Sequence, residues 1–309
     1  MSVGPIDSVL LIAFGGPTTP HEVRPFLDNV ARGRPIPAAR LDEVASHYAH
    51  MPGGRSPLND LTHAQARALG VALERRGPAL PVFVGMRNWH PYLHEALATM
   101  AAKGHRRVLG MILSPLRTEA SWERYMGDVA QARAKATGAP EVVFAPPWSR
   151  HPRFIAAVAD RCGRALEDVA PANRGATPLV FTAHSVPRTM ADASPYVADF
   201  TAASRAVAEQ LGHQRWSLAY QSRSGSPSDP WLEPDVNDVL GALAGDGARH
   251  AVVCPIGFVC DHVEILFDLD VEARATARAA GLSLHRAAAV NDHPEFIAAL
   301  AEMVRKAAT

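Results

Sequence analysis

The sequence predicts an α/β protein built of two similar halves, each a parallel β-sheet flanked by helices. Short apolar runs alternate with longer amphipathic stretches along the whole chain, an order that favours parallel sheets with helices on both faces. The order of motifs in the first part of the chain recurs in the second part. With 309 residues, 48% of them hydrophobic and 20% charged, the chain is long enough for two globular domains.

Eight apolar runs predict the strands, at residues 9–14, 81–86, 108–113, 141–145, 179–183, 217–220, 251–254 and 282–286. Amphipathic periodicity between them, often followed by Gly, predicts helices at residues 61–74, 91–102, 122–136, 152–166 and 197–211. We expect the halves to be residues 1–148 and 149–309, with the last helix packing back on the first half.

The internal repeat pairs two strand ends that are candidates for binding a ligand. Residues 10–17 (LLIAFGGP) align without gaps with residues 180–187 (VFTAHSVP), which makes Phe14 and His184 equivalent. Ser114-Pro115 and Cys254-Pro255 follow a second matching pair of strands. In Rossmann-like and other open parallel sheets, ligands bind at the carboxyl ends of strands, so we expect an active-site cleft between the halves. The alternative is that these loops are only tight strand-to-helix turns.

Composition and missing motifs exclude several functions. Lys+Arg 31 against Asp+Glu 31 leaves no net charge, so we expect no nucleic-acid partner. No apolar run reaches the roughly 18 residues of a membrane-spanning helix. The three cysteines form no CxxC pair, which favours a reducing cytoplasm. The absence of GxxxxGK[ST], GxGxxG and GxSxG argues against nucleotide, dinucleotide and serine-hydrolase functions.

His184 stands where a predicted buried strand ends, two residues before Val186-Pro187. A single histidine is more often structural than catalytic. At a strand end, however, an imidazole with a pKa near neutral suits a general base or a metal ligand.

The segment 255–272 (PIGFVCDHVEILFDLDVE) carries the densest chemical signal. Glu264, Asp268 and Glu272 recur at every fourth residue, so on one α-helix they would form an acidic stripe. Carboxylates are ligands for divalent metals, and the stripe would suit a hydrated cation. The alternative is a solvated acidic helix face. Asp261, which precedes His262, is either the N-cap of this helix or a support for a neighbouring ligand.

The first half offers basic and small polar groups in Arg32-Gly33-Arg34 and in residues 53–57 (GGRSP). Such groups can hold the carboxylates of a ligand through charge-assisted hydrogen bonds. Isolated surface arginines are common, so these residues alone are a weak signal.

Residues 10–17, 53–58, 181–187 and 255–272 together resemble the ferrochelatase family, in the same order and at the same spacing. The resemblance covers the whole chain through residues 293–297 (HPEFI). It implies a chelatase-like fold and insertion of Fe²⁺ into a porphyrin with release of two protons, in haem biosynthesis. His184 and Glu264 match the family's invariant metal-handling pair, and Asp268 and Glu272 would deliver the metal or remove protons.

The resemblance also implies substrate-binding residues. Arg32, Ser56 and Tyr125 match positions that hold propionates in coproporphyrin ferrochelatases, and His47 stands where the family has a second propionate arginine. Phe14 stands where coproporphyrin-using relatives generally have Tyr, and it cannot ligate iron. We expect coproporphyrin III as substrate. The alternatives are protoporphyrin IX, a sirohydrochlorin cobalt or iron chelatase, and a non-catalytic haem-binding protein.

The remaining expectations concern cofactors and partners. Fe²⁺ is a substrate, so no cofactor is required, and no iron–sulfur cluster is expected because no Cys follows Cys260. The partners are the porphyrin and the haem product, together with transient contacts to other enzymes of the haem pathway. We expect a cytoplasmic monomer that is able to contact a membrane peripherally.

Overall fold

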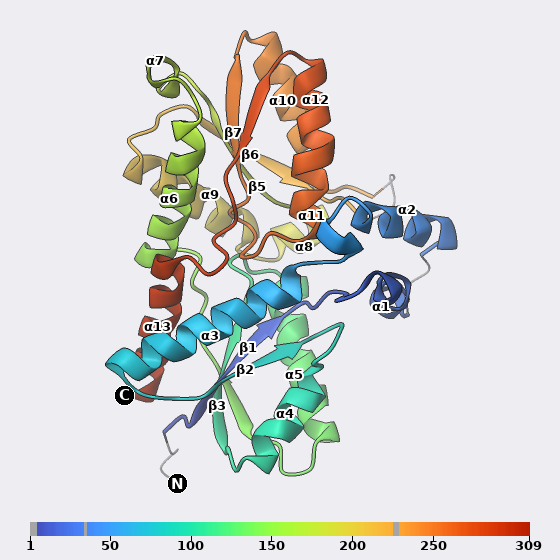
Figure 1. Cartoon of the computed structure of the whole chain (residues 1–309), viewed down its shortest axis with the longest axis vertical. Helices are drawn as coiled ribbons and strands as arrows, with labels where there is room; N and C mark the ends of the chain where they lie inside the picture. The colour runs from blue at the N-terminus through green and yellow to red at the C-terminus, as the bar shows by residue number, and fades with distance from the viewer. Residues whose placement is uncertain (1–4, 34–35, 225–228) are drawn as a thin grey trace. The chain divides into compact units, whose positions relative to one another are not determined.

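The computed structural model describes residues 5–33, 36–224 and 229–309, so Arg34 lies outside the described residues. The chain divides into two compact units. Unit 1 contains the residues up to Ser114, Ala120–Pro146 and Ile297–Thr309, and unit 2 contains Pro115–Glu119 and Pro147–Phe296. Each unit has its own sheet with helices on both faces (Figure 1).

Unit 1 holds a four-stranded parallel sheet in the order β2-β1-β3-β4. Its strands are β1 (Ser8–Ala13), β2 (Val82–Met86), β3 (Arg107–Ile112) and β4 (Glu141–Phe144). Every residue of β1 is buried, as expected for a central strand between two parallel neighbours. The helical segments are η1 (Pro20–Glu22), α1 (Val23–Ala31), α2 (Ala38–Tyr48), η2 (Pro52–Gly54), α3 (Leu58–Arg76), α4 (Leu93–Ala102), η3 (Glu119–Glu123) and α5 (Arg124–Lys135).

Unit 2 repeats this architecture with the strand order β6-β5-β7-β8. Its strands are β5 (Leu179–His184), β6 (Trp216–Gln221), β7 (His250–Cys254) and β8 (Ser283–Arg286). The helical segments are α6 (Pro152–Glu167), α7 (Pro171–Arg174), α8 (Arg188–Asp192), α9 (Tyr196–Gln210), α10 (Val236–Gly245), α11 (Val263–Leu266), η4 (Asp268–Ala273) and α12 (Arg274–Ala279). A core of buried side chains from β5, β7, α10, α11, η4 and α12 fills one side of this sheet.

The last helix, α13 (Pro294–Ala308), begins in unit 2 and belongs to unit 1 from Ile297 onward. Within unit 1, the Arg305 guanidinium near its end donates hydrogen bonds to the carbonyl oxygens of Gly77 (3.0 Å) and Ala72 (3.4 Å). These bonds fix the end of the chain to the C-terminal turn of α3.

The two units share details beyond strand order. In unit 1 the Met86 amide donates to the Pro91 carbonyl oxygen, and in unit 2 the Tyr220 amide donates to the Pro234 carbonyl oxygen, each at the end of the equivalent strand. The predicted fold class, two similar α/β halves with parallel sheets, is confirmed. All eight predicted strands lie within two residues of their observed bounds, because most of them are short apolar runs that end at a polar or turn residue. The exception in composition is β8, whose sequence SLHR holds one apolar residue.

Gly257 provides a test of how tightly unit 2 is packed at the end of β5. Its amide donates to the Thr182 carbonyl oxygen, and a Cβ on it would lie 2.7 Å from Ala183 Cα. Gly257→Ala should therefore lower the free energy of unfolding by about 1–3 kcal/mol in urea titrations. The control is Gly241→Ala in α10, where a Cβ would meet nothing within 4 Å. It should be neutral or stabilise by up to about 1 kcal/mol, and equal losses in both variants would contradict the packing argument.

Candidate active site

His184 is the last residue of β5, a strand that is buried up to this point. The strand is fixed here by its pairing with β6: His184 lies in register with Gln221, and the Ser185 amide donates to the Gln221 carbonyl oxygen at 2.7 Å. The Tyr196 hydroxyl, from α9, donates to the His184 carbonyl oxygen at 2.8 Å. The backbone beneath the imidazole is thus held from two sides.

The two ring nitrogens of His184 have different partners. Nδ1 hydrogen-bonds the carbonyl oxygen of Ser185. A carbonyl oxygen can only accept, so Nδ1 carries a proton and donates it. Nε2 lies 3.6 Å from Glu264 Oε1. In the neutral imidazole, Nε2 is then the basic nitrogen, and it is available to accept a proton or to bind a metal.

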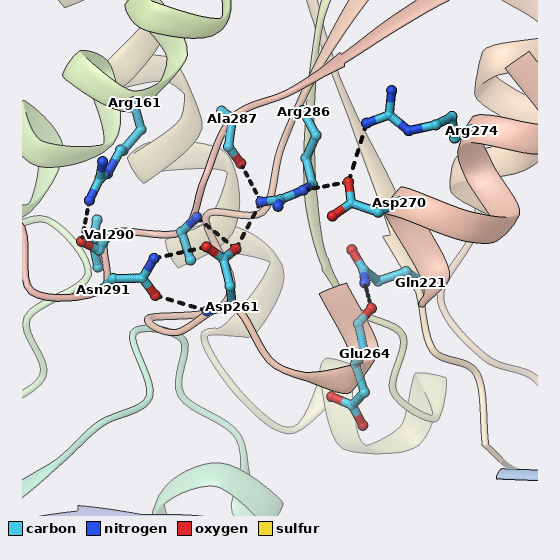
Figure 2. Close-up of polar contacts among 11 residues, drawn as sticks. Arg161, Gln221, Asp261, Glu264, Asp270, Arg274, Arg286, Ala287, Val290 and Asn291 are labelled. Atoms are coloured by element: carbon cyan, nitrogen blue, oxygen red, sulfur yellow. Dashed lines mark hydrogen bonds and ion pairs between the residues drawn. The ribbon is translucent and has the colours of Figure 1, made fainter. Parts of the chain in front are cut away.

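Glu264 lies in the first turn of the short helix α11. The His262 side chain caps this helix, because its Nδ1 accepts a hydrogen bond from the Glu264 amide at 3.2 Å. The Gln221 side-chain amide donates to the Glu264 carbonyl oxygen at 2.6 Å. Figure 2 shows the Glu264 carboxylate pointing away from that bond, and its side chain is 41% exposed. The backbone is fixed while the carboxylate remains accessible.

The charges of this pair reinforce each other. Partial burial opposes ionisation of Glu264, but the positive charge of His184, assisted by His262, lowers the Glu264 pKa to about 2. Burial also opposes protonation of His184, but the Glu264 carboxylate and the Ser185 carbonyl raise the His184 pKa above its usual value. Near neutral pH, Glu264 is a carboxylate and His184 exchanges protons easily.

Asp268 differs from Glu264 although both are carboxyl groups of the same segment. Burial raises the Asp268 pKa to about 7, and the charges of Glu264 and Glu272 add to this, against the hydrogen bond that the Ser222 hydroxyl donates to Asp268 Oδ2. Glu272 is exposed. Asp268 can therefore take up and release a proton near neutral pH.

The predicted single acidic helix is wrong in its geometry. The segment is instead the short helix α11, the π-helical turn η4 and the helix α12. The amides of Val271 and Glu272 both donate to the Phe267 carbonyl oxygen, which widens the helix at this point. The four-residue spacing therefore does not place the three acidic residues on a regular stripe. In the described part of the chain, no three His, Cys, Asp or Glu side chains form a ready metal-binding cluster.

Asp261 does not cap the helix, a role that His262 takes. Its carboxylate instead accepts hydrogen bonds from Arg286 (2.8 Å), the Ala289 amide (3.1 Å) and the Asn291 side chain (2.8 Å). Of the two roles that the sequence allowed for Asp261, the structure thus rules out the cap.

The substrate-binding residues predicted in unit 1 occupy different settings. Phe14 directly follows β1, is 39% exposed and contacts Phe26 of α1 edge-on at 6.3 Å between ring centroids. Arg32 is exposed at the end of α1. Tyr125 is buried in α5 beneath the Arg87 guanidinium, which lies 5.2 Å from the ring centroid.

Ser56 and His47 are less simple candidates. Ser56 is 2% exposed, and its hydroxyl oxygen accepts a hydrogen bond from the Leu58 amide (3.2 Å), so it also helps to begin α3. His47 is half-buried in α2, and burial together with the charge of Arg40 lowers its pKa. The lowered pKa favours the uncharged form of His47 at neutral pH, whereas an arginine at this position would carry a positive charge.

Sequence reasoning missed Gln221 and Ser222, which hold Glu264 and Asp268 from the end of β6. The rule that ligands gather at the carboxyl ends of parallel strands points to them, since they follow the strand next to β5. It also missed Arg286, because no spacing in the sequence pairs residue 286 with Asp261.

Comparison with known proteins identifies the family. A family model described as Ferrochelatase matches residues 7–308. A protein of Mycobacterium bovis (strain BCG / Pasteur 1173P2) named coproporphyrin III ferrochelatase is 46% identical over 295 residues, covering 94% of this chain and 83% of that protein. A protein of the same name from Mycolicibacterium smegmatis is 41% identical over 302 residues, covering 96% and 88%.

Solved structures show the same fold at low identity. SirB from Bacillus subtilis with Fe³⁺ superposes with a TM-score of 0.59 at 12% identity, over 98% of this chain and 95% of that one. A multi-domain protein of Deinococcus radiodurans with structural similarity to chelatases superposes with a TM-score of 0.56 at 17% identity, over 98% of this chain and 55% of that one. The sequence matches, which span nearly the full chain, show that this protein belongs to the ferrochelatase family.

Proposed function

We propose that this protein inserts Fe²⁺ into coproporphyrin III and releases two protons, as a step of haem biosynthesis. The carrying observation is the His184–Glu264 pair, in which a basic ring nitrogen faces an ionised carboxylate at 3.6 Å. The curated relatives named coproporphyrin III ferrochelatase support the choice of porphyrin.

The chemistry requires a base, because the two pyrrole N–H groups lose their protons as the metal enters. We assign the accepting atom to His184 Nε2, since Nδ1 is committed to the Ser185 carbonyl. Glu264 stabilises the imidazolium that forms and, as a carboxylate, is also able to bind the incoming metal. Asp268, whose pKa is about 7, can take protons onward to the exposed Glu272.

We assign substrate binding to the residues of unit 1. Arg32 is exposed, and its planar guanidinium group suits a propionate carboxylate. Tyr125 and Ser56 offer hydroxyl groups, and neutral His47 offers a ring nitrogen. Phe14 presents an exposed ring that suits contact with a flat macrocycle and supplies no metal ligand.

We further propose that the protein carries no iron–sulfur cluster and works as a cytoplasmic monomer, with transient contacts to other enzymes of the pathway and peripheral contact with a membrane. Its three cysteines are free thiols and buried, which suits a reducing compartment. No helix in the described ranges is both long and apolar enough to cross a bilayer.

Removing the carboxylate charge of Glu264 tests the metal and proton chemistry. Glu264→Gln should lower kcat by roughly 10²–10³, the usual cost of removing one group that stabilises charge formed during the reaction. Asp268→Asn and Glu272→Gln should act mainly on the apparent KM for the metal. Zinc insertion followed by porphyrin fluorescence measures all three, and small, equal effects would favour a merely solvated acidic segment.

The pH dependence should follow His184. Only the neutral imidazole accepts a proton, so kcat/KM should rise with pH and reach half its plateau above 6.5, where the raised pKa of His184 lies. Glu264→Gln removes the negative charge that raises this pKa, so the midpoint should move to lower pH. An unchanged midpoint in the residual activity of that variant would assign the titration to another group.

Substrate choice should depend on Arg32. A charge-assisted hydrogen bond contributes about 1.5–3 kcal/mol, or roughly one to two powers of ten in binding. Wild type should have a higher kcat/KM for coproporphyrin III than for protoporphyrin IX, and Arg32→Ala should narrow this gap. The matched control is Arg24→Ala on the same helix, because Arg24 is paired with Asp28 and Asp42. Preference of wild type for protoporphyrin IX would overturn the coproporphyrin assignment.

A further inference from the structure

Arg286 contacts both ends of the segment that carries Glu264, as Figure 2 shows. It is the last residue of β8. Its Nη1 donates to Asp261 Oδ1 at 2.8 Å, and its Nε donates to Asp270 Oδ1 at 2.7 Å. One guanidinium group therefore bridges a residue before α11 and a residue after it, with Glu264 and Asp268 between them.

This bridge is largely shielded from water. The side chains of Arg286, Asp261 and Asp270 are 13%, 15% and 26% exposed. Burial alone would lower the Arg286 pKa, but its hydrogen bonds and charge interactions with the two carboxylates raise it. Charge-assisted hydrogen bonds are about twice as strong as neutral ones, and loss of one partner leaves a shielded charge uncompensated.

The start of the segment is fixed further by Asn291. Its side-chain oxygen accepts from the Asp261 amide (2.9 Å), and its side-chain nitrogen donates to Asp261 Oδ2 (2.8 Å). The middle of the segment is held by the Gln221 bond to the Glu264 carbonyl oxygen. The Glu264 carboxylate thus belongs to a backbone segment that polar contacts hold at the start, middle and end of the segment.

We propose that Arg286 is a positioning residue, which holds the Asp261–Asp270 segment so that the Glu264 carboxylate faces His184. The inference rests on the proposed function, since it gives Glu264 its role. Catalytic groups must be held within about 0.5 Å of their productive geometry. A displacement of about 1 Å can cost 10²-fold in rate.

The competing explanation is that apolar packing alone places the segment. Ile265 and Leu269 are fully buried in the core of unit 2 and also anchor it. If they suffice, Arg286 contributes to stability but not to the rate of the chemical step. The two explanations predict different values of kcat for an Arg286 variant, and different rates of local opening of the backbone around Glu264.

Paired Arg-to-Lys substitutions separate these explanations. Lysine keeps the charge but lacks the planar fork that bridges two carboxylates. Arg286→Lys should lower kcat by roughly 10–100-fold. It should leave the KM for the metal and the KM for the porphyrin within about threefold of their wild-type values. Arg274→Lys is the matched control, because Arg274 contacts the same Asp270 carboxylate at 3.5 Å but is 52% exposed, and its Nη1 donates to the Leu284 carbonyl oxygen (3.5 Å) instead of to a second carboxylate. It should stay within about twofold of wild type.

Hydrogen exchange on the metal-free protein gives a readout that does not depend on activity. In Arg286→Lys, amides of residues 259–273 should exchange faster while those of β5 and β7 keep their wild-type rates. If that variant does not fold, Asp270→Asn, which keeps the side-chain shape and removes one charge of the bridge, should show the same local pattern.

The outcomes separate the two proposals. A wild-type protein without metal-insertion activity would refute the proposed function, even if exchange in Arg286→Lys rose only in residues 259–273. An active wild type with Arg286→Lys within about twofold of its kcat would overturn the positioning role. Faster exchange in every strand of unit 2 would also overturn it, because the effect would then be general destabilisation.

Discussion

The pairing of β5 with β6 is the interaction on which the candidate site depends. Six residue pairs in parallel register, from Leu179↔Trp216 to His184↔Gln221, bring two strand ends together. One end presents the imidazole, and the other supplies the amide and hydroxyl that hold Glu264 and Asp268. A shift of one residue in the register of these strands would turn each side chain to the opposite face of the sheet. The geometry of the site is therefore inherited from the sheet.

The environment of each carboxylate, and not its residue type, decides its role. Glu264 faces a partner that becomes positively charged, which keeps it ionised. Asp268 is largely buried and lies near the negative charges of Glu264 and Glu272, which favours its protonated form. Such separation of pKa values between neighbouring carboxyl groups is a common way to provide a fixed charge and a mobile proton within one site.

The sequence was sufficient for the central strands β1, β3, β5 and β7, because a parallel strand between two neighbours must be largely apolar and ends at a polar or turn residue. It was also sufficient to single out His184 and Glu264 as candidate site residues, because each lies in a distinctive motif. It was not sufficient for the π-helical turn at Asp268–Ala273, because a four-residue spacing of acids looks the same in a regular helix. Nor could it show that Asp261 pairs with Arg286, a contact that forms only after β8 has joined the sheet.

The duplicated architecture also explains how one chain can combine unlike chemistries. Phe14 and His184 stand at the equivalent strand end in the two copies of one strand arrangement, yet one is an apolar ring and the other a titratable base. Two identical subunits encoded by one gene would change both positions with every mutation. Joining the copies in a single chain frees each strand end to diverge alone, so one copy can specialise in surface complementarity and the other in acid–base reactivity.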